Sequence, residues 1–70
     1  MQQVEIRVKG RIDPHWSEWL EGLQISHANQ DISILTGSII DQTTLYGLIS
    51  KLRDLGLALI YLRCVEDKGE

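Results

Sequence analysis

Asp41-Gln-Thr-Thr-Leu-Tyr-Gly-Leu-Ile-Ser-Lys-Leu-Arg-Asp-Leu-Gly-Leu-Ala-Leu-Ile-Tyr-Leu-Arg63 is the stretch of the chain that decides its fold, because a helix, a stop and a strand follow one another directly. Asp41 is a favourable N-cap residue, and the leucines after it recur at helical spacing. Gly56 suits the left-handed residue that ends a helix. The stretch predicts a helix over about 42–55 and a strand over about 57–65 that is apolar on both faces.

The N-terminal segment predicts another strand and a shorter helix. Val4-Glu-Ile-Arg-Val-Lys9 alternates apolar and charged residues, which predicts a strand over about 3–9. Asp13-Pro14 is a helix-start signal, since aspartate caps and proline fits the first helical position. Apolar residues at helical spacing follow it and predict a helix over about 14–21: Trp16, Trp19, Leu20 and Leu23.

The middle of the chain predicts a β-hairpin, and with it a fold class. Two alternating runs, over about 23–28 and 31–37, are joined by the turn residues Ala28-Asn-Gln-Asp31. The predicted order β-α-β-β-α-β is the ferredoxin-like split βαβ arrangement of the α+β class. We therefore expect one domain over residues 1–70, with a four-stranded antiparallel sheet and two helices on one face. The main alternative keeps the same elements but reduces the first helix to a turn.

Strand alternation predicts an unusual surface at the last strand. Its even positions, from Ala58 to Cys64, are apolar and are expected to face the helices, which leaves the odd positions on the uncovered face. The parity of the hairpin adds one more leucine to that face. The predicted apolar interface comprises Leu35, Leu57, Leu59 and Tyr61. Three cations are expected at its margin: Arg7, Lys9 and Arg63.

Length and composition restrict how the chain is stabilised and where it works. Seventy residues build only a small core, and the single cysteine excludes a disulfide within one chain. Self-association is therefore the expected source of additional stability. A net charge of −3 gives no general attraction to nucleic acid or anionic lipid. The first residues do not resemble a signal peptide, and no apolar run is long enough to span a membrane. We expect a cytoplasmic protein with no membrane partner.

Three functional hypotheses follow. The first is a non-catalytic homo-oligomeric interaction or regulatory module, with a dimer favoured, because the last strand exposes apolar residues. The second is a small-ligand-binding domain whose site lies between subunits, an argument from fold analogy alone. The third is weak binding of nucleic acid or another anion, since cations and an aromatic ring share a face: Arg7, Lys9, Tyr61 and Arg63.

Residues with chemical potential form no recognisable reaction centre, so we expect no enzyme, no cofactor and no metal. His15 and His27 stand twelve positions apart and neither has a partner at metal-ligand spacing. Cys64 is expected on the core face, where a thiol behaves as a small hydrophobe. Trp16 and Trp19 are interpreted as core residues in a chain that has no phenylalanine.

Three segments resemble a known family. Trp16-Ser-Glu-Trp-Leu-Glu-Gly-Leu23, Asp41-Gln-Thr-Thr-Leu-Tyr-Gly-Leu48 and Arg53-Asp-Leu-Gly-Leu57 are similar to a family of small, uncharacterised, stand-alone bacterial proteins of about this length. The D-Q-x-x-L-x-G-L-[LI] pattern is distinctive, and this chain has Ile49 at its last position. The resemblance implies a bacterial, free-standing domain. It implies no activity and assigns no functional residue.

Overall fold

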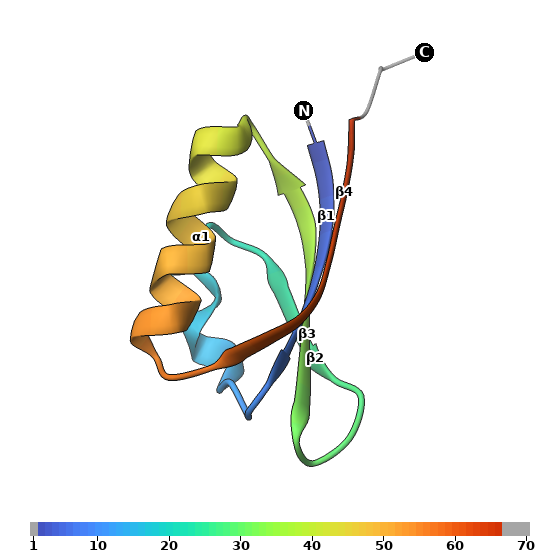
Figure 1. Cartoon of the computed structure of the whole chain (residues 1–70), viewed down its shortest axis with the longest axis vertical. Helices are drawn as coiled ribbons and strands as arrows, with labels where there is room; N and C mark the ends of the chain where they lie inside the picture. The colour runs from blue at the N-terminus through green and yellow to red at the C-terminus, as the bar shows by residue number, and fades with distance from the viewer. Residues whose placement is uncertain (1, 67–70) are drawn as a thin grey trace.

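A sheet of four antiparallel strands carries one α-helix on one of its faces in the computed structural model of the chain (Figure 1). The structure describes residues 2–66. In chain order the elements are β1 (Gln2–Lys9), the 3-10 helix η1 (Pro14–Ser17), β2 (Gln24–His27), β3 (Ile32–Ile39), α1 (Gln42–Asp54) and β4 (Ala58–Glu66). The protein is therefore of the α+β class.

The strand order across the sheet is β2-β3-β1-β4, so β2 and β4 are its two edges. β1 lies opposite β3 with Ile6 facing Leu35, and opposite β4 with Ile6 facing Leu62. In Figure 1, α1 lies along one side of the sheet. We call this side the core face and the opposite side the open face.

One apolar cluster fills the space between the core face and α1. The helix contributes a stripe at helical spacing, Leu45, Leu48 and Leu52, all buried. The strands and the segment around η1 supply the other buried members: Val4, Ile6, Val8, Ile12, Leu20, Leu23, Leu35 and Ile39. None of these lies on β4. Cys64 of β4 is partly buried against this cluster, so the core reaches the β4 edge but leaves its large apolar side chains exposed.

The caps of α1 agree with its sequence signals. The Asp41 carboxylate accepts hydrogen bonds from the Thr44 backbone N–H at 2.9 Å and from the Thr44 hydroxyl at 3.0 Å. These bonds favour the charged form, and the backbone bond contributes most to lowering the pKa of Asp41. At the other end Gly56 has φ +80°, a left-handed conformation that glycine adopts without strain.

The helix predicted over 14–21 is wrong, because the segment forms only the 3-10 helix Pro14–Ser17. Asp13 does cap it, accepting a hydrogen bond from the His15 backbone N–H that lowers the pKa of Asp13. The chain then turns away, with φ +63° at Glu21 and +73° at Gly22. The Ser17 hydroxyl closes this turn by donating to the Leu23 carbonyl at 2.6 Å.

This difference changes the fold description. With one α-helix the element order is not the ferredoxin-like β-α-β-β-α-β arrangement that the sequence predicts. The short connection through η1 covers the sheet near β2, and α1 alone covers the middle of the core face (Figure 1). α1 contacts both β3 and β4, but within residues 2–66 no second full helix lies beside it over the β4 edge.

A buried serine fixes the connection after β1. Ser33 is fully buried on the core face of β3, where its hydroxyl donates to the Gly10 carbonyl at 2.7 Å and accepts from the Ile12 backbone N–H at 3.0 Å. The His27 Nε2 atom lies 2.9 Å from the Ile12 carbonyl oxygen, close enough for a hydrogen bond. Both side chains are therefore used to satisfy backbone groups of one loop.

Candidate interaction surface

Large apolar side chains are exposed along the whole of β4. Their exposed fractions are 48% for Leu59, 53% for Ile60, 41% for Tyr61, 38% for Leu62 and 47% for Val65. We call these five residues the β4 surface. All are more than a third exposed and lie on one edge strand, four of them consecutive in the sequence. Exposed apolar side chains gathered on one strand mark interaction sites more often than scattered leucines do.

A β-bulge distributes the β4 surface over both faces. Arg7 lies opposite Tyr61, but the next residue of β1, Val8, lies opposite Leu59, so Ile60 has no partner in β1. An extra residue in one strand reverses the alternation beyond it. Leu62 and Cys64 therefore share the core face with Leu59, while Tyr61, Arg63 and Val65 lie on the open face.

The predicted face of Leu59 is therefore wrong. Strict alternation through the last strand places Leu59 with Tyr61, whereas the bulge at Ile60 places it with Val8 on the core face. Leu59 nevertheless stays exposed, because none of the fully buried core residues lies on β4. Leu59 and Tyr61 therefore both lie on the edge strand β4, but on opposite faces of the sheet.

Two other residues of the predicted interface face inward. Leu35 is fully buried opposite Ile6, so the predicted outward position of Leu35 is wrong. Leu57 is partly buried against the core cluster, and its side chain occupies the space that a Cβ atom on Gly10 would need. Three residues that the predicted interface does not include are exposed instead: Ile60, Leu62 and Val65.

The predicted cations lie on the open face, where one of them, Arg7, makes an ion pair within the chain. The Arg7 guanidinium makes an ion pair with Glu5 at 2.8 Å and lies 5.4 Å from the centre of the Tyr61 ring. Arg63 lies opposite Glu5 in the β1–β4 ladder. Lys9 lies at the far end of β1, opposite Ala58. The structure thus brings Arg7 to the Tyr61 ring and places Arg63 on the same face. The ion pair with Glu5 weakens the field that Arg7 offers to an external anion.

The tryptophans form a second exposed aromatic group, contrary to their interpretation as core residues. Trp16 and Trp19 are both exposed, with ring centres 5.4 Å apart in an edge-on arrangement. The Lys51 ammonium lies 5.3 Å from the Trp19 ring centre and donates to the Trp19 carbonyl at 2.8 Å. The chain turns at Glu21 and Gly22 directly after this segment, so the α-helix whose apolar stripe would include both indoles does not form.

The remaining polar residues do not assemble into a reaction centre. His15 Nδ1 pairs with Asp13 at 2.9 Å, and the Cys64 thiol donates to the Gln2 side chain at 3.2 Å. Within residues 2–66 no three histidine, cysteine, aspartate or glutamate side chains gather in a way that would hold a metal ion. Gly47 lies in the exposed part of α1, where a Cβ atom would meet open space.

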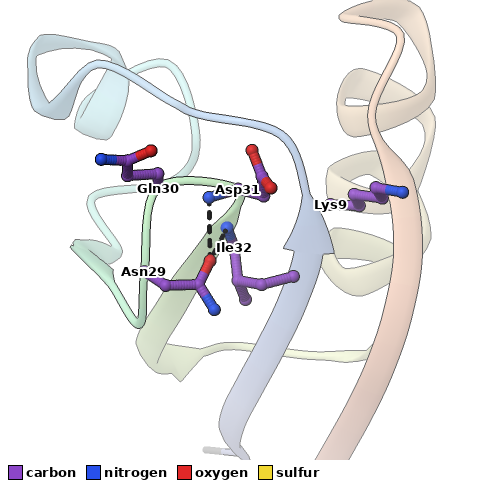
Figure 2. A pocket seen from close by; sticks show the side chains of 5 residues that line it. All are labelled: Lys9, Asn29, Gln30, Asp31 and Ile32. Carbon is purple, nitrogen blue, oxygen red and sulfur yellow. Dashed lines mark hydrogen bonds between the residues drawn. The ribbon is translucent and has the colours of Figure 1, made fainter.

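A shallow pocket beside the β2–β3 hairpin is lined by Lys9 and residues 29–32 (Figure 2). The Asn29 side-chain oxygen is already engaged, because it accepts from the backbone N–H groups of Asp31 at 2.8 Å and Ile32 at 3.0 Å. Figure 2 shows the Lys9 side chain pointing away from the hairpin loop. The pocket is thus explained by turn geometry and offers no convergent set of free polar groups.

Comparison with known proteins gives one match. A family model described as a domain of unknown function (DUF8691) matches residues 3–63. No curated protein matches the chain, and no solved structure matches it. No helix among the described residues has the length and apolar character needed to cross a membrane.

Proposed function

The chain belongs to the family of the domain of unknown function DUF8691, and we propose that it works as a homodimeric, non-catalytic interaction or regulatory module joined through β4. The observation that carries the proposal is the β4 surface itself. A nine-residue edge strand has five large apolar side chains that are more than a third exposed. A dimer would cover these side chains and pair the backbone groups of the strand edge.

The composition of β4 supports pairing because the strand has few charges and no proline, although it does have a bulge, another feature that protects edges. Exposed edge strands are normally shortened, charged or interrupted by proline, which prevents them from adding to other sheets. Between Ala58 and Val65 the strand has a single charge, Arg63, and no proline. Its bulge at Ile60 leaves the segment Tyr61–Val65 in regular register with β1.

A second copy of this chain is the partner that the two edges favour. The opposite edge, β2, has only four residues, and its open-face side chains Gln24 and Ser26 are polar and exposed. Head-to-tail addition of β4 to β2 would match a long apolar edge to a short polar one and would not close. Antiparallel pairing of β4 with β4 is self-complementary and closes after two copies.

The small size of the core is a reason why dimerisation would stabilise the fold. A domain of this size buries a modest share of its surface, so a second copy is a common source of additional stability. Across β4 the sheet would continue into the second copy, and the core faces of both copies would lie on one side with their α1 helices. Apolar side chains at the end of each core would then be covered by the other subunit.

The proposal predicts that stability rises with protein concentration. When folding and association are linked, a tenfold increase in concentration adds about 1.4 kcal/mol per dimer. For two chains of this size, that free energy corresponds to a rise in the unfolding midpoint of roughly 3–5 °C. Circular dichroism melts over a hundredfold concentration range measure the effect. A midpoint that stays constant over that range contradicts a dimer at those concentrations.

A further inference from the structure

We propose that the two β4 strands pair antiparallel about a two-fold axis at Leu62, so that Arg63 of each copy lies opposite Tyr61 of the other. This inference rests on the proposed dimer and specifies its register. It assigns Arg63 a contact in the second copy in addition to its position opposite Glu5 within its own chain. Tyr61 would then lie between Arg7 of its own chain, 5.4 Å away, and Arg63 of the second copy.

The faces of β4 restrict the possible registers. Directly opposed residues in an antiparallel ladder project from the same face of the sheet. Leu62 is on the core face, and Tyr61 and Arg63 are on the open face. Registers that oppose Leu62 to an open-face residue are therefore excluded. The two-fold axis must therefore pass through a residue of the regular segment, and that residue alone lies opposite its own copy.

The bulge leaves two registers with the longest overlap. In the first register the axis lies at Leu62 and Ile60 stays unpaired on both sides of its strand. Leu59 then lies opposite Cys64 of the second copy, both on the core face. Ala58 lies opposite Val65 of the second copy, both on the open face. An axis at Arg63 gives an overlap of equal length, shifted by one residue. Axes at Tyr61 or Cys64 pair fewer residues, because one end of the strand then runs past its partner.

Charge selects between these two registers. An axis at Arg63 places the two guanidinium groups directly opposite each other, and like charges in such pairs are destabilising. An axis at Leu62 separates them and places each guanidinium beside a tyrosine ring, which attracts cations. It also brings together two leucine side chains that each chain alone leaves partly exposed on its core face.

Disulfide trapping tests the register directly. Single cysteines are introduced as Tyr61→Cys, Leu62→Cys and Arg63→Cys in a Cys64→Ser chain, and covalent dimers are measured on non-reducing gels during mild oxidation. Directly opposed strand residues have Cβ atoms about 4.5–5.5 Å apart, close to the separation that a disulfide needs, whereas diagonal neighbours are farther apart. Leu62→Cys is expected to cross-link at least about tenfold faster than the other two.

Mixing experiments and mass measurements separate the failure of the register from the failure of the dimer. A mixture of the Tyr61→Cys and Arg63→Cys chains is expected to form the mixed disulfide faster than either symmetric one. Fastest trapping of Arg63→Cys overturns the register and leaves the β4 dimer intact. A dimeric chain that traps at none of the three positions overturns β4 pairing, and a chain that stays at 8.0 kDa in solution overturns the proposed function itself.

Discussion

Leu62→Asp is expected to convert the dimer into a monomer of 8.0 kDa. Leu62 is 38% exposed in the single chain, and in the proposed dimer it lies on the two-fold axis against its own copy. The substitution removes an apolar contact at the centre of the interface and places two carboxylates opposite each other. Central, desolvated interface residues contribute at least about 2 kcal/mol, which corresponds to about a thirtyfold weaker association.

Ile40→Asp is the matched control for this prediction. Ile40 is 77% exposed and lies between β3 and α1, outside the β4 surface. The Ile40→Asp substitution also changes a large exposed aliphatic side chain to aspartate. It therefore reports any general effect of added charge on association. Sedimentation velocity measures the mass of both variants, and circular dichroism checks that they are folded. A folded Leu62→Asp chain that keeps the mass of the unaltered protein would contradict the placement of the interface on β4.

Leu35→Ala is expected to lower the free energy of unfolding by about 2–5 kcal/mol, the range for leucine deletions in a packed core. Leu35 is fully buried opposite Ile6, at the centre of the sheet. The loss should appear at every protein concentration, because the cavity forms within one chain. Urea unfolding measures it, with Ile34→Ala as the control, since Ile34 is the neighbouring residue on the open face and is only partly buried.

This variant also separates the two positions that have been considered for Leu35. If Leu35→Ala weakened association without lowering the stability of the monomer, Leu35 would belong to an interface, as strand parity in the sequence predicts. A large loss of stability in the monomer agrees with the buried position in the structure.

The C-terminal half is predicted well from sequence because its signals agree with one another. Asp41 caps α1, a leucine stripe faces the core, and Gly56 has the left-handed conformation that ends the helix. The exposed apolar edge also follows from sequence, since a strand that is apolar on both faces has a surplus of apolar side chains wherever it pairs. The position of β4 at the edge of the sheet then leaves that surplus uncovered.

The errors arise where tertiary contacts decide between two local patterns. β3 has apolar residues at both parities, Ile32 and Ile34 on one face and Leu35 and Ile39 on the other, so alternation alone does not select its inner face. Ser33 is on the inner face because its hydroxyl is needed by the backbone after β1. The sequence of β3 alone therefore does not indicate that Ser33 is a core residue.

The bulge and the missing helix have similar explanations. Ile60 looks like any other apolar residue of its strand, and only the register with β1 leaves it without a partner. The helical spacing of Trp16, Trp19 and Leu20 is present, but the left-handed residues Glu21 and Gly22 follow within one turn. The segment is then too short for the helical pattern to bury the tryptophans.

Sedimentation equilibrium of the unaltered chain tests most directly whether β4 is covered by a second copy. A dimer joined through β4 has a mass of twice 8.0 kDa at high concentration and dissociates reversibly toward 8.0 kDa on dilution, which is the expected result. A mass of 8.0 kDa at every concentration up to the millimolar range would contradict it.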